Sequence, residues 1–303
     1  MQFLPRTKDS WVSSHKYFMN KQKRAELYAN TVELCKKGIY TSPNGKDIRI
    51  DGLDDYMIQG TKFYGKKVVN KYDTLPRYET EIKVINNDCL YEAKNMIDNG
   101  LKPAVLNMAS FHTPGGGVIS GSAAQEENLF RRTNLFKSLY QFHHLGDEYG
   151  IEQRGEERYP LEMNYGGIYT PKVIVFRGSD DVDYQLMEEP FYVDIITLPA
   201  VKKPKVENGK IVPWAETIIK NKIKQIFNIA LENGNDSLVL SAFGCGAYGT
   251  PPEQMAKFFA DVLASEKYQG LFKVIHFAIL NVPSTNGEHN PHGNFQPFKD
   301  VFG

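Results

Sequence analysis

Long apolar stretches are missing from this chain. No window approaches the roughly 18 consecutive apolar residues that a helix needs to cross a bilayer, so we expect no membrane-spanning helix. Residues 1–18 mix lysine, aspartate, serine and histidine without an apolar centre, so we expect no secretory signal there. Internal repeats and low-complexity tracts are also missing from the sequence.

Cysteine is scarce. Cys35, Cys89 and Cys245 lie far apart, without the spacing of a metal site or a redox pair. This usage is typical of a reducing compartment, so we expect an intracellular protein, cytoplasmic or, in a eukaryote, nuclear.

The chain has no net charge, because 36 basic residues balance 36 acidic ones. Neutrality argues against sequence-independent binding of nucleic acid. A polyanionic ligand would have to be held locally, by backbone N–H groups and a few cations. The basic runs at 202–205 and 220–224 are candidates for that, although such runs are more often solvated faces.

The residues that are present suit a globular protein. A length of 303 residues fits one large α/β domain or two small ones, and 41% hydrophobic residues are enough for a substantial core. Apolar residues at helical spacing predict helices at 21–37, 90–97, 123–142, 215–231 and 253–263. Short apolar runs predict strands at 82–85, 104–108, 173–176, 192–198, 238–242 and 274–280.

The alternation of strands and helices from residue 81 onward predicts a sheet between two helical layers. Residues 1–80 show less periodicity beyond the helix at 21–37, so we interpret them as an accessory region packed on a core of residues 81–303. We expect the two parts to form one structural unit. Ligands of such sheets bind beyond the carboxyl ends of the strands, where the loops at 107–121 and 243–250 begin.

The loop after the strand at 104–108 carries the most informative motif. Gly115, Gly116 and Gly117 are consecutive, and glycine allows positive φ angles and a close approach of the backbone to a ligand. Backbone N–H groups bared in this way suit a phosphate or diphosphate. Gln125, Glu126 and Glu127 follow, and Ser122 with Gln125 fits a capping box. By themselves, two acids in a first helical turn could simply offset the helix dipole.

The glycine triplet followed by Gln-Glu-Glu resembles the signature of the poly(ADP-ribose) glycohydrolases. Further blocks at 164–171, 193–200 and 238–249 occur in the order of that family and resemble its short, bacterial-type branch. The resemblance implies a three-layer α/β/α macrodomain with a mixed central sheet and an N-terminal helical extension. It also implies hydrolysis of ribose–ribose O-glycosidic bonds in poly(ADP-ribose), with release of ADP-ribose and without a metal or other cofactor.

The resemblance also implies roles for particular residues. Glu127 would be the acid/base that protonates the leaving ribose hydroxyl and then activates water, and Glu126 would hold hydroxyls of the leaving ribose. The glycine triplet would line the diphosphate and distal ribose, and Tyr248 would pack over the ligand. The candidate substrate-binding residues are Asn107, Gly115, Gly116, Gly117, Gln125, Gly244, Gly246, Ala247, Tyr248 and Asp88.

Glycoside hydrolysis needs one carboxyl group to be protonated near neutral pH. The helix N-terminus favours the anion, whereas a neighbouring carboxylate, partial burial and the substrate diphosphate favour the protonated form. We expect the second set of effects to prevail once substrate is bound.

Four residues keep two interpretations each. Asp88 either reads the adenine amino group or forms a local turn, and Asn107 either contacts the distal ribose or anchors the loop. Cys245 between two glycines is better explained as a small residue in a tight loop than as a nucleophile. His112 either tunes substrate access or is an inert exposed side chain.

Three alternative functions are considered. The chain could remove single ADP-ribose units from protein side chains, or bind ADP-ribose without turnover, although a reader needs no paired acids. A nucleotide phosphohydrolase would need metal-binding acids near the phosphates, which the glycine loop lacks. The expected partners are poly(ADP-ribose) or ADP-ribosylated proteins, with no membrane and no sequence-specific nucleic acid, and we expect a monomer.

Overall fold

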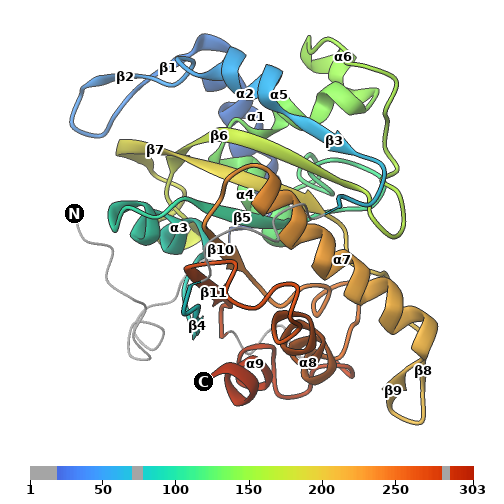
Figure 1. Ribbon diagram of the computed structural model, residues 1–303. Coiled ribbons are helices and arrows are strands. Elements are labelled where there is room, and N and C mark those ends of the chain that lie inside the picture. The colour runs from blue at the N-terminus through green and yellow to red at the C-terminus, as the bar shows by residue number, and fades with distance from the viewer. Residues whose placement is uncertain (1–18, 70–77, 282–286) are drawn as a thin grey trace.

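The computed structural model describes residues 19–69, 78–281 and 287–303 (Figure 1). Within this part of the chain, a seven-stranded sheet has the order β3-β6-β7-β5-β10-β11-β4. Neighbouring strands from β4 to β7 are parallel, whereas β6 and β3 are antiparallel additions at one edge, so the sheet is mixed as predicted. The strands are β3 (Lys62–Tyr64), β4 (Glu81–Ile85), β5 (Pro103–Met108), β6 (Gly167–Arg177), β7 (Leu186–Leu198), β10 (Ser237–Leu240) and β11 (Val274–Ala278).

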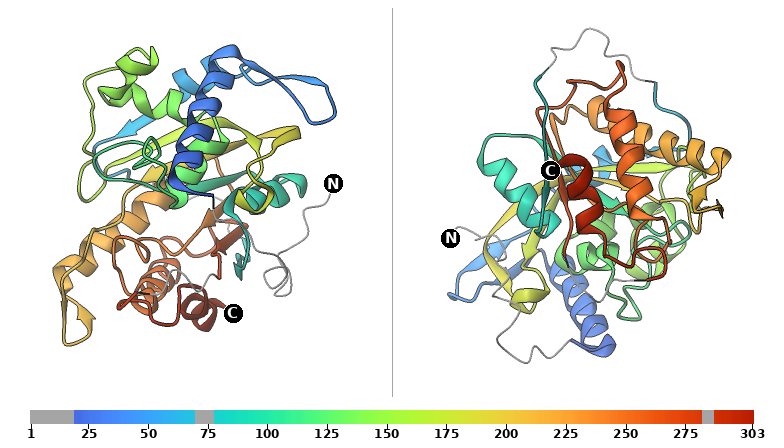
Figure 2. Two further views of the ribbon diagram at one scale, coloured as in Figure 1. Left: turned by 180° about the vertical axis from the view of Figure 1, so that it is seen from behind. Right: turned by 90° about the horizontal axis from the view of Figure 1, so that it is seen from below.

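Helices cover both faces of the sheet (Figures 1 and 2). Because successive side chains of a strand point to opposite faces, Ala104 and Leu106 of β5 enter one apolar cluster and Val105 enters the other. The first cluster is completed by α7 (Pro213–Glu232), α8 (Pro252–Leu263) and α9 (Phe295–Phe302). The second is completed by α1 (Lys21–Lys37), α2 (Asp54–Gly60), α3 (Cys89–Asp98), α4 (Gln125–Arg132) and α5 (Leu135–Leu139). The predicted three-layer α/β/α architecture is therefore confirmed.

The remaining elements are short. They are the hairpins β1 (Ile39–Thr41) with β2 (Asp47–Arg49) and β8 (Val206–Glu207) with β9 (Lys210–Ile211), the helix α6 (Leu145–Tyr149), and the 3-10 helices η2 (Tyr140–Phe142) and η3 (Asp180–Val182). No helix in the described ranges is long and apolar enough to cross a membrane.

The predicted helix at 21–37 is confirmed, with Gly38 in the left-handed conformation just beyond its end. The single helix predicted at 123–142 is wrong, because the chain forms α4, α5 and η2 instead. Tertiary hydrogen bonds cause the break. Thr133 forms a β-bridge with Val175, and the Asn134 side chain accepts a hydrogen bond from the Ile174 N–H at 3.1 Å.

The N-terminal part is closely joined to the sheet. Its strand β3 pairs antiparallel with β6, and the C-terminal half of α1 reaches across to the Arg131 carbonyl, which accepts from Thr31 at 2.6 Å. The boundary at residue 80 stays a prediction, and residues 1–18 and 70–77 of that region lie outside the described residues.

The basic run at 220–224 is not the solvated face that such runs usually form. Lys220 does pair with Glu216 and Asp261, at 2.7 Å each. Lys222 is 1% exposed, and its ammonium group has no hydrogen-bond partner among the described residues. Burial lowers the pKa of Lys222 to about 8. Helical periodicity turns this lysine inward on α7, which the charge pattern alone did not reveal.

Candidate active site

The candidate site forms in the loop between β5 and α4. Tight turns compact this loop, with the Gly116 N–H donating to the Thr113 carbonyl and the Val118 N–H to the Gly115 carbonyl, each at 3.0 Å. Gly115 and Gly116 have φ angles of +80° and +54°, which side-chain-bearing residues rarely adopt. The turns bring the glycines back against the first turn of α4, where Glu126 and Glu127 lie.

Glu126 is buried at the centre of the loop, with 3% of its surface exposed. Its carboxyl group accepts hydrogen bonds from the N–H groups of Ser110 at 2.6 Å and Gly115 at 3.0 Å. The Asn107 amide is a third, more distant donor at 3.4 Å. Donors from the end of β5 and from both sides of the loop therefore fix the position of this carboxyl group.

Glu127 is held at one oxygen only. Its Oε1 accepts from the Gly117 N–H at 2.9 Å. Its Oε2 is buried and has no hydrogen-bond partner among the described residues. A buried carboxyl oxygen normally finds a partner, so the orphaned Oε2 is a candidate contact for a ligand.

Gly116 lies against both carboxyl groups. A Cβ atom built on Gly116 would be 2.6 Å from Oε1 of Glu127 and 3.3 Å from Oε2 of Glu126. A Cβ on Gly115 would instead meet the Phe130 ring at 2.6 Å. A side chain at either position would therefore displace neighbouring groups where the loop approaches α4, whatever ligand binds.

The expectation that the glycine triplet bares its N–H groups is wrong. The N–H groups of Gly115 and Gly117 donate to Glu126 and Glu127, and that of Gly116 donates to Thr113. The loop closes on its own acids because the carboxyl oxygens are acceptors within reach of these N–H groups. That these glycines line a diphosphate or ribose stays a prediction.

The predicted capping box is also wrong. Helix α4 begins at Gln125 after Ala124, with no side-chain cap, and the N–H of Ser122 donates to the Gly117 carbonyl. The Gln125 amide instead bridges to β5, accepting from the Met108 N–H at 2.8 Å and donating to the Leu106 carbonyl at 2.7 Å. Gln125 thereby fixes the start of α4 against the end of the strand, and a substrate-binding role for it stays a prediction.

Asn107 is fully buried at the end of β5. Besides its contact with Glu126, its amide donates to the Thr197 hydroxyl of β7 at 3.2 Å. Its Oδ1 has no partner among the described residues. The anchoring interpretation agrees with these contacts, and the contact with a distal ribose stays a prediction.

The second candidate loop follows β10 and meets the first through Tyr248. The Tyr248 hydroxyl accepts from the Phe111 N–H at 3.1 Å and donates to the Ala109 carbonyl at 3.4 Å. Within the described chain, the N–H groups of Gly246, Ala247 and Tyr248 have no recorded acceptor, and the first two residues are exposed. These N–H groups are thus better placed than the glycine triplet to receive a phosphate.

Two other residues stabilise the second loop from inside. Gly244 has a φ angle of +75°, and a Cβ there would lie 2.9 Å from both Ala200 and Thr250. Cys245 is fully buried, and burial raises the pKa of its thiol well above the ordinary value. A neutral, buried thiol is a poor nucleophile, which agrees with the structural interpretation of Cys245.

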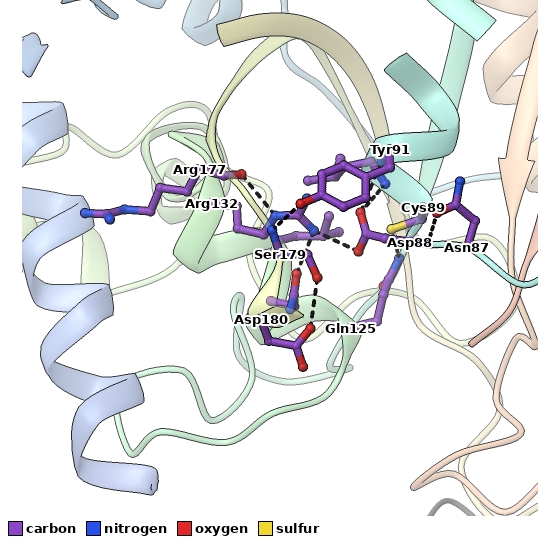
Figure 3. A network of polar contacts seen from close by, with 12 residues as sticks. Asn87, Asp88, Cys89, Tyr91, Gln125, Arg132, Arg177, Ser179 and Asp180 are labelled. Carbon is purple, nitrogen blue, oxygen red and sulfur yellow. Dashed lines mark hydrogen bonds and ion pairs between the residues drawn. The ribbon is translucent and has the colours of Figure 1, made fainter. Parts of the chain in front are cut away.

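Asp88 belongs to a buried polar network behind the loop (Figure 3). One of its oxygens caps α3 by accepting from the N–H groups of Leu90 and Tyr91, and the other pairs with Arg132 of α4 at 2.8 Å. Arg132 is fully buried and also donates to the Arg177 carbonyl at 3.2 Å. The local structural role of Asp88 is thus observed, and its contact with adenine stays a prediction.

His112 is exposed on the outer side of the first loop and borders a cavity of about 660 Å³. His143, His144 and Tyr159 line the same cavity from the segment after η2. The two neighbouring histidine rings lie 4.0 Å apart, and burial together with His144 lowers the pKa of His143. No group of three or more His, Cys, Asp or Glu side chains in the described chain could hold a metal ion.

Sequence reasoning missed the contribution of α1 to the loop. The Arg24 guanidinium donates to the Gly121 carbonyl at 2.6 Å. A Cβ on Gly121 would clash with the Lys21 carbonyl oxygen, so the loop and α1 touch backbone to backbone. The sequence carries no local signal for a contact across about a hundred residues.

Burial raises the pKa of Glu126 to about 8, against the three hydrogen-bond donors that lower it, and the charge of Glu127 adds to the increase. Glu126 is therefore mainly protonated at pH 7.

This raised pKa gives a pH dependence of stability. Because native Glu126 binds its proton more tightly than the unfolded chain, its contribution is complete below about pH 4.3 and is lost as pH rises towards 8. We expect the melting temperature to fall by several degrees between pH 5 and pH 8, and Glu126→Gln to lack that part of the fall. Calorimetric scans of both proteins across this range measure the difference, and identical pH profiles would contradict the assignment.

The fold and site together define a class: a three-layer α/β/α domain with two loops at the carboxyl ends of its central strands and a buried carboxyl pair in one of them. A family model for the catalytic domain of microbial-type PARG, poly(ADP-ribose) glycohydrolase, matches residues 28–178. The chain belongs to this family, and it is an enzyme of the macrodomain superfamily.

Solved structures agree over most of the chain. The poly(ADP-ribose) glycohydrolase of Thermomonospora curvata bound to the inhibitor ADP-HPD has a TM-score of 0.74 and 28% identity, covering 93% of this chain and 100% of that one. Another structure of that enzyme has a TM-score of 0.73, 27% identity and the same coverage. The enzyme of Deinococcus radiodurans in complex with ADP-ribose has a TM-score of 0.64 and 26% identity, covering 84% and 98%. No curated protein sequence matches this chain.

Proposed function

We propose that this enzyme hydrolyses the ribose–ribose O-glycosidic bonds of poly(ADP-ribose) and releases ADP-ribose, with Glu127 as its acid/base. The observation that carries the proposal is the buried Oε2 of Glu127, which has no protein partner among the described residues and lies in a loop built around two carboxyl groups. The likeness to two bacterial poly(ADP-ribose) glycohydrolases supports the choice of substrate.

The proposed reaction requires one proton on the carboxyl pair when substrate is bound. Glu127 delivers the proton to the leaving ribose oxygen while C1 of the other ribose gains oxocarbenium character. The ionised Glu127 then takes a proton from water as the water adds to C1, which restores the pair. Glu126, fixed by Ser110 and Gly115, orients ribose hydroxyls and keeps the proton available to its neighbour.

In this proposal the diphosphate of the substrate binds to the second loop. The N–H groups of Gly246, Ala247 and Tyr248 supply donors there, whereas those of the glycine triplet already bind the acids. The triplet contributes by its lack of side chains, since any Cβ at Gly116 would fill the space beside the carboxyl pair. Neither step requires a metal, since carboxyl and backbone N–H groups do the work.

The test is product analysis in the presence of a strong metal chelator. Defined poly(ADP-ribose) and a mono-ADP-ribosylated protein are incubated separately with the pure enzyme. We expect free ADP-ribose from the polymer and an intact last unit on the protein, because the acids serve a ribose hydroxyl as leaving group. Efficient removal of the last unit would move the assignment to a mono-ADP-ribosyl-protein hydrolase. Binding of ADP-ribose without any product would indicate a non-catalytic reader, and activity that depends on added metal would indicate a phosphohydrolase.

A further inference from the structure

A basic arm extends from the molecule next to the second loop. We define the arm as residues 201–214, which run from the end of β7 through the hairpin β8–β9 to the first turn of α7. The hairpin projects from the end of α7, away from the sheet (Figures 1 and 2). Neither the carboxyl pair nor the two loops require such a projection, so its composition needs a separate explanation.

The arm concentrates positive charge in a chain of zero net charge. Lys202, Lys203, Lys205 and Lys210 are all exposed, and Glu207 is its one acidic residue, so the arm has a formal charge of +3. The exposed ion pair of Lys205 with Glu207, at 2.7 Å, removes little of this charge from solvent. The patch therefore suits an anionic partner.

The arm also exposes an aromatic ring. Trp214, in the first turn of α7, is 57% exposed, and Val206 on the hairpin is 43% exposed. A tryptophan left this open has a flat face on which a nucleic base can stack. Cations interleaved with aromatic faces are how proteins hold flexible strands that carry phosphates and bases.

The arm is held in a fixed shape before any partner binds. Asn208 and Gly209 at its tip both have positive φ, at 50° and 74°, as a two-residue hairpin turn requires. The Gln254 side chain of α8 accepts from the Ile211 N–H at 2.8 Å and donates to the Gly209 carbonyl at 3.1 Å. At the base, the Val212 N–H donates to the Lys205 carbonyl at 3.0 Å, so little ordering remains to be done on binding.

The base of the arm is connected to the candidate site. The Lys203 N–H donates to the Tyr248 carbonyl at 2.7 Å, and the Tyr248 hydroxyl in turn contacts Phe111 of the first loop. A long, chain-like ligand whose end occupies the candidate site could therefore continue past the second loop and along the arm.

We propose that the arm binds the part of a poly(ADP-ribose) chain that extends beyond the unit in the site. This inference rests on the proposed function. Each unit of that polymer carries a diphosphate and an adenine. The diphosphates would pair with the lysines of the arm, and an adenine would stack on the Trp214 ring. The arm retains long polymer after each cut, and it adds nothing for a ligand of one unit.

The experiment compares ligands of different length in the Glu127→Gln background, which prevents turnover. Anisotropy measures binding of end-labelled polymer of about twenty units and of labelled ADP-ribose. One variant combines Lys202→Ala, Lys203→Ala and Lys210→Ala, and a second is Trp214→Ala. The charge-matched control combines Lys46→Ala, Lys102→Ala and Lys267→Ala, which remove exposed lysines elsewhere.

Trp214→Ala is expected to weaken polymer binding about tenfold, since stacking on one base contributes roughly that much or more. The triple lysine variant is expected to weaken it by a similar factor, of the order of tenfold, because it removes three cations that contact phosphates. ADP-ribose affinity stays within about twofold. The triple arm variant also lowers the slope of log affinity against log salt by about 2, at roughly 0.7 per phosphate contact. The control triple variant keeps the affinity and the slope of the parent protein.

Equal losses in the arm and control variants, or equal losses for polymer and ADP-ribose, would overturn the proposal. Poly(A) RNA of the same phosphate count that bound the arm as tightly as the polymer would also overturn it, in favour of a nucleic-acid surface. Failure of the proposed function is a separate result: the enzyme without the Glu127 change would release no ADP-ribose, while the arm variants would still lose polymer binding. Normal release, with arm variants that bind polymer like the control, would reject this inference alone.

Discussion

Glu127→Gln is expected to abolish the release of ADP-ribose from poly(ADP-ribose). Removal of an acid/base group lowers the rate by about 10²–10⁴-fold. The amide is isosteric: its oxygen can keep the hydrogen bond from the Gly117 N–H, and its NH₂ group takes the place of Oε2, which meets no protein donor in the described chain. Affinity for ADP-ribose should therefore stay within a few-fold. Chromatography of released product and calorimetric titration with ADP-ribose measure the two quantities.

Glu253→Gln is the matched control for this variant. Glu253 also lies in a first helical turn, that of α8, but it is exposed. We expect it to keep normal turnover. Near-normal turnover by Glu127→Gln, with the control unchanged, would show that the acid/base is another group.

Gly116→Ala is expected to lower turnover at least a hundredfold while the protein still folds. The new methyl group would lie 2.6 Å from Oε1 of Glu127 and 3.3 Å from Oε2 of Glu126, so both carboxyl groups must move. A displacement of about 1 Å of a catalytic group costs about 10²-fold in rate. Turnover on polymer and a thermal melt of the same sample separate catalysis from folding.

Gly45→Ala controls for backbone strain. Gly45 has a φ angle of +79°, and a Cβ there meets no atom within 4 Å. Alanine in the left-handed region costs about 1–2 kcal/mol at either position, so Gly45→Ala measures the loss of melting temperature that comes from backbone strain alone. Only Gly116→Ala should lose activity. Comparable turnover in the two variants would mean that the contact between Gly116 and the carboxyl pair is unimportant for catalysis.

The local pattern of apolar residues predicted most of the core elements. The helix at 21–37 and the core strands β5, β10 and β11 were found because their apolar residues follow the period of a helix or form a short apolar run. The hairpin β6–β7 was found only in part. Its predicted pieces at 173–176 and 192–198 are mainly buried, whereas the outer half of β7 is largely half-exposed and lacks a clear apolar signal.

The motif predicted which residues form the candidate site, and the structure changed the hydrogen bonds expected of them. The motif brought together Asn107, the glycine triplet and the acid pair, and the structure places these residues around one carboxyl centre. It did not show that the glycine N–H groups bind the acids, or that Gln125 bridges to β5. Those hydrogen bonds depend on the path of the loop between two elements, which no local pattern encodes.

The sequence by itself determined the fold class, the order of core elements and the family, because apolar periodicity and a glycine-acid motif are local properties of the chain. Only the tertiary structure decided the charge state of Glu126, the burial of Lys222 and the contact of α1 with the loop. Each of these depends on which groups surround an atom in space. Solvent exclusion and hydrogen bonding act through distance, so residues far apart in sequence set them.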